Sequence, residues 1–155
     1  MTTDPRTLYQ EVILDHNRKP RNYGRLEDAT RKAEGLNPLC GDHIWVYVRT
    51  AGADVEGIAF EGQSCAICKA SASMMTAAVK GRSVAEAERL AHEFRDMATG
   101  KLDTAAGTHH LGRLTVFSGV RDLPTRVKCA ILPWHAVIAA VEGRQEPVST
   151  ETESI

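Results

Sequence analysis

The feature that most constrains the fold is a pair of short β segments in the first half of the chain. Side chains alternate in character along His43–Thr50, as in a strand whose two faces differ. One face carries Ile44, Val46 and Val48, and the other carries Trp45, Tyr47 and Arg49. A second β segment, Val55–Phe60, follows the turn Ala51–Asp54. Because so short a connection joins antiparallel neighbours, these residues predict a β-hairpin.

Apolar residues recur at helical spacing on both sides of this hairpin. Four helices are expected, which begin near Asp4, Cys65, Ser83 and Asp122 and end at Pro20, Gly81, Gly100 and Gly143. Ser83 and Glu86 have the spacing of a capping box. We also expect a short edge strand around Thr30–Glu34, a mobile connection over residues 101–112 and a short element at Leu114–Val120. The order of elements predicts an α+β fold, a small antiparallel sheet with helices packed on one face.

The length and charge of the chain limit the classes of protein to which it can belong. Its 155 residues fit one domain, which we place at residues 1–143, and the polar residues 144–155 are expected to form a disordered tail. Lys and Arg number 19 against 20 Asp and Glu, which argues against a nucleic-acid-binding protein. No apolar run approaches the ~20 residues that cross a bilayer, and the N-terminus lacks the pattern of a signal peptide. We therefore predict a cytoplasmic protein without membrane or nucleic-acid partners.

Three of the four cysteines have local surroundings that favour a thiolate. Cys40 lies in a tight turn before a strand, and Cys65 opens a helix, where unpaired N–H groups favour an anion. Cys129 lies early in the last helix, close to the cations Arg126 and Lys128. In a reducing compartment, free cysteines favour a metal-binding or catalytic role over disulfides. Both roles require the ionised sulfur that these surroundings promote.

A carboxylate close to the first cysteine completes a candidate metal-binding set. Asp42 follows Cys40 by two residues, and both side chains reach one centre if the turn at Gly41 folds sharply. Three thiolates and one carboxylate form a tetrahedral shell suited to zinc. Arg126 or Lys128 would offset the negative charge of such a site from behind its ligands. Buried, unreactive cysteines are the alternative interpretation.

Several segments resemble one family. They are Asn37–Asp42 (Asn-Pro-Leu-Cys-Gly-Asp), Gly62–Ile67, Ala70–Met75 and Arg126–Ala130, with Leu8–His16 and Lys19–Asn22 before them. Together they resemble the SufU branch of the IscU/NifU N-terminal superfamily of iron–sulfur cluster assembly proteins. The resemblance extends over residues 6–143, and the three cysteine motifs in this order are its most specific part.

Two features resemble SufU more closely than IscU. The chain contains an additional segment at residues 100–120, and Lys128 stands where IscU proteins carry a histidine before the third cysteine. Because an ammonium group cannot bind a metal, the fourth ligand must come from elsewhere. The resemblance implies one zinc ion per chain, held by Cys40, Asp42, Cys65 and Cys129.

The resemblance also implies a function and partners. A SufU-like protein accepts persulfide sulfur from a SufS-like cysteine desulfurase and passes it on to other SUF components, a sulfurtransferase-type activity. Cys40 is the favoured acceptor because its turn is short and next to Gly41, and Cys129 is the second candidate because IscU proteins use that position. One alternative is a scaffold that holds iron or a [2Fe–2S] cluster on Cys40, Cys65 and Cys129. A structural zinc domain that only binds partners is the other.

Two residues depart from the family pattern. Cys68 forms a Cys-x-x-Cys motif with Cys65, which could mark a redox pair, a reserve sulfur ligand or simply a partly buried helix residue. Pro133 lies inside the last predicted helix, where it cannot donate to the carbonyl of Cys129. It predicts a kink between these two residues, with His135 beyond it at the surface.

Overall fold

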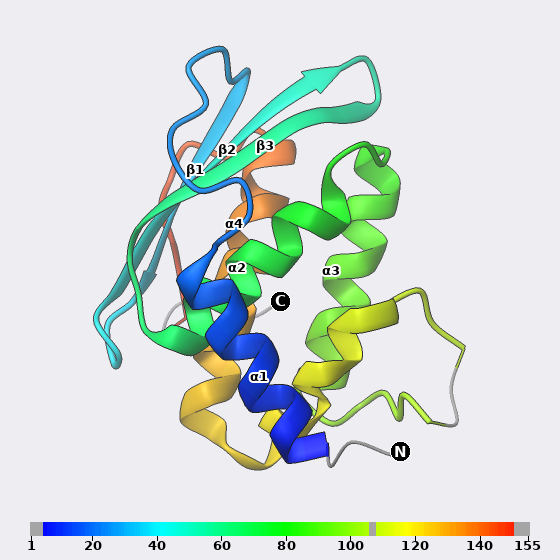
Figure 1. The fold of residues 1–155 in the computed structure, drawn as a ribbon. Coiled ribbons are helices and arrows are strands. Elements are labelled where there is room, and N and C mark those ends of the chain that lie inside the picture. The colour runs from blue at the N-terminus through cyan, green and yellow to red at the C-terminus, as the bar shows by residue number, and fades with distance from the viewer. Residues whose placement is uncertain (1–4, 106–107, 151–155) are drawn as a thin grey trace.

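The computed structural model describes residues 5–105 and 108–150, which form one sheet and a group of helices (Figure 1). The elements are α1 (Pro5–Arg18), β1 (Arg31–Asn37), β2 (Asp42–Ala51), β3 (Asp54–Gln63), α2 (Ala66–Val79), α3 (Val84–Ala98), the 3₁₀ helix η1 (Gly112–Asp122), α4 (Pro124–Val141) and β4 (Val148–Ser149). The predicted α+β class and the four predicted helices are confirmed. The connection predicted to be mobile includes residues 106–107, which lie outside the described residues.

The sheet is built on the predicted hairpin. Its strand order is β3-β2-β1-β4, and β2 pairs antiparallel with both β1 and β3. The inward residues Ile44, Val46 and Val48 are fully buried, as their alternation predicts. A bulge between Arg49 and Thr50 shifts the register close to the hairpin turn. The predicted edge strand corresponds to β1 and is longer than expected. It is not at the edge of the sheet, because it lies between β2 and β4.

The C-terminal segment corrects the prediction of a disordered tail over 144–155. Val148 and Ser149 pair in parallel with Gly35 and Leu36, so the sheet is mixed rather than purely antiparallel. Val148 is 3% exposed. Burial of this one apolar side chain stabilises the contact of an otherwise polar segment with the sheet. The prediction is therefore wrong for these residues, while residues 151–155 lie outside the described part of the chain.

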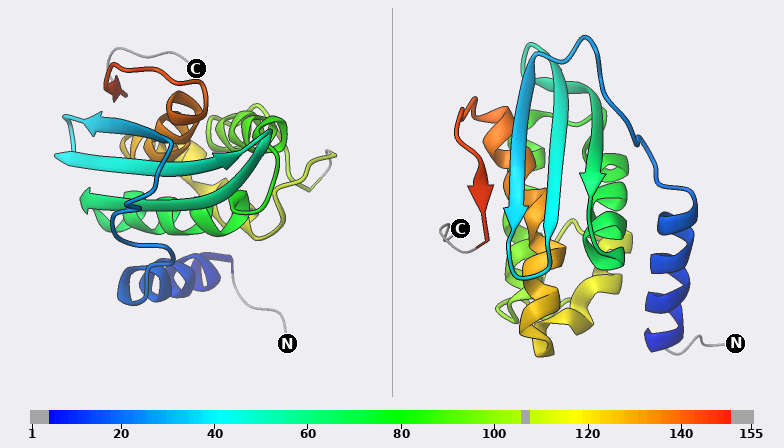
Figure 2. Two further views of the ribbon diagram at one scale, coloured as in Figure 1. Left: turned by 90° about the horizontal axis from the view of Figure 1, so that it is seen from above. Right: turned by 90° about the vertical axis from the view of Figure 1, so that its left-hand side faces the viewer.

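The helices pack on one face of the sheet, as predicted, and α4 lies at the centre of them (Figure 2). It contacts β1, β2, α2, α3 and η1, whereas α1 lies at the margin against α2 and η1. Trp134 of α4 is fully buried and stacks on Phe94 of α3, with ring centroids 4.9 Å apart. No helix in the described part of the chain is long and apolar enough to span a bilayer.

Pro133 does not end α4, which continues from Pro124 to Val141. Proline leaves the carbonyl of Cys129 without its helical donor. In the same turn the hydroxyl of Ser71 donates to the carbonyl of Ala130 at 2.6 Å, which supports the helix from α2. The kink itself stays a prediction. The surface position expected for His135 is wrong, because this side chain is buried and burial lowers its pKa to about 4.

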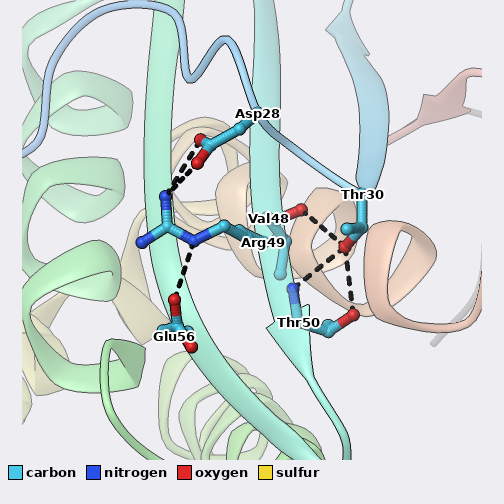
Figure 3. A network of polar contacts seen from close by, with 6 residues as sticks. All are labelled: Asp28, Thr30, Val48, Arg49, Thr50 and Glu56. Carbon is cyan, nitrogen blue, oxygen red and sulfur yellow. Dashed lines mark hydrogen bonds and ion pairs between the residues drawn. The ribbon is translucent and has the colours of Figure 1, made fainter.

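The outer face of the sheet carries a polar clamp (Figure 3). Arg49 donates to both carboxylate oxygens of Asp28, at 2.9 and 2.7 Å, and to Glu56 at 3.1 Å. The hydroxyl of Thr30 accepts from the backbone N–H of Thr50 at 2.9 Å. The clamp therefore ties the loop before β1 to β2 and β3, which fixes the point where β1 enters the sheet.

Gly62 supplies the first prediction, because β3 approaches β2 very closely there. A Cβ at Gly62 would lie 2.2 Å from the carbonyl oxygen of His43, and its φ of +134° is already unfavourable for other residues. We expect Gly62→Ala to lower the free energy of unfolding by about 3 kcal/mol or more, as measured by urea denaturation.

Gly24→Ala is the matched control, because Gly24 has a φ of +129° but nothing within 4 Å of a Cβ. It should cost only the backbone strain, about 1 kcal/mol. Equal losses in the two variants would mean that the close approach at Gly62 is unimportant.

Candidate metal centre

The sequence-predicted site residues meet at one end of the sheet. The turn between β1 and β2 carries Cys40, Asp42 is the first residue of β2, Cys65 precedes α2, and Cys129 lies in α4. In Figure 1 this turn and the start of α2 lie at the same end of the molecule. Three segments that are distant in sequence thus contribute to one cluster of three thiols and a carboxylate.

Three of these side chains form a compact group. The sulfurs of Cys40 and Cys129 and a carboxylate oxygen of Asp42 all lie within 4.8 Å of one another. The two sulfurs are 3.2 Å apart. Gly41 adopts a φ of +73°, which lets the turn fold sharply enough to bring Cys40 and Asp42 together.

Cys65 borders this group from the N-terminus of α2. Its sulfur is 3.9 Å from Asp42 Oδ2, and its backbone N–H donates to Asp42 Oδ1 at 2.7 Å. Cys65 is also the N-cap of the helix, since its sulfur accepts from the N–H of Cys68 at 3.4 Å. The helix start therefore presents N–H donors to both the sulfur and the carboxylate, as the sequence predicts.

The thiols next to each other have opposite pKa shifts. A hydrogen bond from Cys129 lowers the pKa of Cys65 to about 7, helped by backbone N–H groups of α2 against the effect of burial. The same hydrogen bond, together with burial, raises the pKa of Cys129 above its usual range. Of these two thiols, Cys65 is thus the one that ionises near neutral pH, and Cys129 holds its proton.

Asp42 is the residue of the cluster whose burial most requires compensation by hydrogen bonds or charge. It is only 2% exposed, and it accepts hydrogen bonds from Cys65 N–H and from the side-chain amide of Asn37 at 3.0 Å. Among the side chains that the structure describes, no basic group forms an ion pair with it. A buried carboxylate among three thiols lacks a cation, and a bound metal ion would supply one.

The donor set and its spacing fit zinc. Sulfur ligands about 2.3 Å from one tetrahedral ion lie roughly 3.8 Å apart. The 3.2 Å between the sulfurs of Cys40 and Cys129 is within about 0.6 Å of that value. Thiolates are soft ligands that favour zinc or iron–sulfur clusters, whereas calcium and magnesium require oxygen ligands.

The remaining predicted residues lie around the cluster. Cys68 is fully buried, and burial raises its pKa well above the usual value, which fits the interpretation of a core residue. All four cysteines are free. Lys128 is half-buried on α4, and Arg126 is exposed. Burial raises the pKa of Tyr9, and the nearby charge of Arg126 opposes this rise. The role of both cations in offsetting charge stays a prediction.

Sequence reasoning missed Asn37. The sequence assigned this residue no role beyond the segment Asn37–Asp42, yet its buried amide donates to Asp42 and, at 3.4 Å, to the sulfur of Cys129. One signal was available. Ala33 and Gly35 precede Asn37 on the inward face of β1, so a polar side chain points into the core between candidate ligands.

Comparison with known proteins identifies the family and supports the fold. A profile of the NifU-like N-terminal domain matches residues 8–130. The chain is 41% identical over 140 residues to a protein of Bacillus subtilis named zinc-dependent sulfurtransferase SufU, which covers 88% of this chain and 93% of that protein. It is 39% identical over 135 residues to the iron–sulfur cluster assembly scaffold protein IscU of Streptococcus pyogenes, covering 87% and 83% of the two chains.

Solved structures give the same result. A crystal structure described as that of an iron–sulfur cluster assembly scaffold protein for the SUF system, from Fervidobacterium islandicum, superposes with a TM-score of 0.79 at 32% identity and covers 87% of this chain and 97% of its own. The fold and the cysteine cluster therefore define a protein of the iron–sulfur cluster assembly class. This chain belongs to the NifU-like N-terminal domain family, within which SufU and IscU proteins are its relatives.

The opposite pKa shifts give a prediction for the metal-free protein. The alkylation rate of Cys65 should rise with pH and level off above a midpoint near 7, because the thiolate is the nucleophile and its pKa is about 7. Iodoacetamide labelling followed by peptide mass spectrometry measures this rate for each cysteine.

Cys129→Ala removes the hydrogen bond that contributes most to this shift, so the midpoint should move upward. A midpoint that stays near 7 in this variant would contradict the assigned cause. Cys68 is the internal control, since its buried thiol should remain unlabelled until the protein unfolds.

Proposed function

We propose that this protein is a zinc-dependent sulfur acceptor of iron–sulfur cluster assembly. It takes the terminal sulfur of a persulfide on a cysteine desulfurase and passes that sulfur on to other components of the assembly system. The observation that carries the proposal is the convergence of Cys40, Asp42 and Cys129, with Cys65 beside them. The relative named zinc-dependent sulfurtransferase, 41% identical to this chain, supports the same activity.

The proposed zinc ligands are Cys40, Asp42, Cys65 and Cys129. When bound, zinc would keep the thiolates ionised at neutral pH and would compensate the buried charge of Asp42. A carboxylate is a harder ligand than a thiolate, so a site of this mixed composition favours ligand exchange more than a site of four thiolates. Such a centre suits a protein in which one of the zinc-bound thiolates also accepts sulfur.

Cys40 is the proposed acceptor because it lies in an exposed turn and is more accessible than Cys129. It lies half-buried in the turn between β1 and β2, next to Leu39, which is 65% exposed. Cys129, the second candidate, is only 2% exposed within α4. A desulfurase that docks over the turn would therefore meet Cys40 first.

The transfer step balances without a further reactant. The thiolate of Cys40 attacks the outer sulfur of the donor persulfide, which is the electrophilic atom. A new S–S bond forms on Cys40 while the S–S bond of the donor breaks. The donor cysteine leaves as a thiolate with the electron pair of the broken bond. The transferred outer sulfur keeps its hydrogen. The product is a persulfide on Cys40.

A scaffold function is the second candidate. The relative of Streptococcus pyogenes is named a scaffold protein, and Cys40, Cys65 and Cys129 are the ligands that a [2Fe–2S] cluster would use. Lys128 stands in place of a histidine ligand, which favours the sulfur acceptor. A purely structural zinc domain is less suited, since structural sites use four closed ligands and this one includes an accessible turn.

Desulfurase stimulation tests the proposed function directly. With a SufS-like cysteine desulfurase and cysteine, the purified zinc protein should increase sulfide release under reducing conditions. Cys40→Ala should abolish this increase, because the acceptor sulfur is gone. Cys68→Ala is the matched control, since it also removes one thiol but one that lies in the core, and it should retain the stimulation.

The alternatives give different results in the same assay. Anaerobic assembly of a transferable [2Fe–2S] cluster, without stimulation of the desulfurase, would favour the scaffold. Tight zinc binding with neither activity would leave the structural domain. Stimulation that survives in Cys40→Ala but is lost in Cys129→Ala would move the acceptor to Cys129.

Replacement of Asp42 tests the ligand set. Asp42→Ala removes the carboxylate and should weaken zinc binding by more than ~100-fold, beyond the 10–100-fold loss typical of groups that only support ligands. A competition titration with a chromophoric chelator measures the change. Glu34→Ala is the control, because Glu34 is also a carboxylate of the sheet but is half-buried on the outer face, beside His43. Equal zinc affinity in wild type and Asp42→Ala would exclude Asp42 from the site.

A further inference from the structure

The side chain of Asn37 connects three segments of the chain at the metal centre. It is 0% exposed at the end of β1, and its amide nitrogen donates to Asp42 Oδ2 at 3.0 Å and to Cys129 Sγ at 3.4 Å. Its amide oxygen accepts from the hydroxyl of Thr150 at 3.0 Å. This one amide therefore contacts two proposed zinc ligands on one side and the residue after β4 on the other.

The surroundings fix the orientation of the amide. An ionised carboxylate only accepts hydrogen bonds, so the NH₂ group of Asn37 must face Asp42. The amide oxygen then faces Thr150, whose hydroxyl can donate to it. Thr150 is held in turn, because its backbone N–H donates to the carbonyl of Leu36 at 3.1 Å. Reversal of the amide would place oxygen against carboxylate, which the buried setting strongly disfavours.

We infer that Asn37 is a positioning residue of the metal centre and that the C-terminal strand sets its orientation through Thr150. The inference rests on the proposed function, since it concerns the same ligands. One N–H of the amide holds Oδ2 of Asp42, whose other oxygen is held by the backbone of Cys65. Both oxygens of this carboxylate are thereby fixed before any ion binds, and the carboxylate pays less ordering entropy on binding.

The same amide makes the proposed sulfur ligands unequal. The N–H bond to Cys129 withdraws electron density from that sulfur, which makes it a weaker nucleophile, and it also holds the sulfur in position. No described side-chain amide donates to Cys40, whose sulfur lies 3.2 Å from that of Cys129. Asn37 thus makes Cys129 the less reactive of the two sulfurs and leaves Cys40 as the stronger nucleophile. This difference gives a physical reason for Cys40 rather than Cys129 as the acceptor.

Zinc affinity of the isolated protein tests this inference without the desulfurase. Asn37→Leu keeps the size of the side chain and removes its polar atoms, and we expect a 10–100-fold loss of zinc affinity in chelator competition. Asn37→Asp should lose more, because a second carboxylate would repel Asp42. Thr150→Val removes only the hydroxyl that orients the amide, and it should cost a few-fold. Thr76→Val is the control, since Thr76 is also buried and hydrogen-bonded but lies far along α2 from Cys65.

A spectroscopic measurement separates positioning from general destabilisation. In the cobalt-substituted protein, loss of the N–H bond raises the energy of the sulfur electrons of Cys129. The sulfur-to-cobalt charge-transfer bands of Asn37→Leu should therefore move to longer wavelength, whereas those of Thr76→Val should stay with wild type. Circular dichroism reports in parallel whether each variant is folded.

The outcomes distinguish this inference from the proposed function. If Asn37→Leu and Thr150→Val bind zinc as tightly as wild type while Asp42→Ala does not, Asn37 has only a structural role and the inference is wrong, but the sulfur acceptor stands. If wild type itself binds no zinc, both fail. Should Asn37→Leu not fold, an unchanged zinc affinity in Thr150→Val alone would overturn the inference.

Discussion

The structure around the candidate metal centre depends on one buried carboxylate. Transfer of Asp42 from water to its 2% exposed position at the start of β2 costs several kcal/mol, in general terms, unless hydrogen bonds and charge compensate it. The compensation comes from the N–H of Cys65 at the start of α2 and from the amide of Asn37 at the end of β1. These bonds fix a strand, a helix start and a turn relative to one another. The thiols therefore meet where the carboxylate is stabilised.

Backbone conformation makes this arrangement possible. Gly41 has a positive φ that folds the turn between the two proposed ligands, Cys40 and Asp42. Gly62 allows β3 to pass so close to His43 that no side chain fits, three residues before Cys65. This close approach fixes the end of β3, and the N-cap geometry of Cys65 then fixes the start of α2. The two glycines act as geometric constraints on the same cluster from its two sides.

The parts of this fold that depend on neighbouring residues could be predicted from the sequence, and the parts that depend on distant contacts could not. The hairpin, the capping box of Ser83 and Glu86 and the helix start at Cys65 depend on local patterns, and the structure confirms them. Strand β4 was missed because it relies on one apolar residue, Val148, and on pairing with β1 more than a hundred residues earlier. The convergence of the cysteines was expected from their motifs, whereas the role of Asn37 depends on Thr150, which no local pattern connects to it.

The four cysteines show how environment rather than residue type divides chemical roles. Cys68 is one helical turn from Cys65, yet it points into the core, where burial keeps its thiol protonated. Cys65 has a lowered pKa because the end of a helix and a neighbouring thiol donate to it. Cys129 is covered and hydrogen-bonded by an amide, and Cys40 lies in a turn that solvent reaches. A centre made of identical ligands would exchange any of them, so a defined acceptor requires this inequality. The asymmetry originates in the protein groups behind the sulfurs, and it exists before a metal ion or a partner arrives.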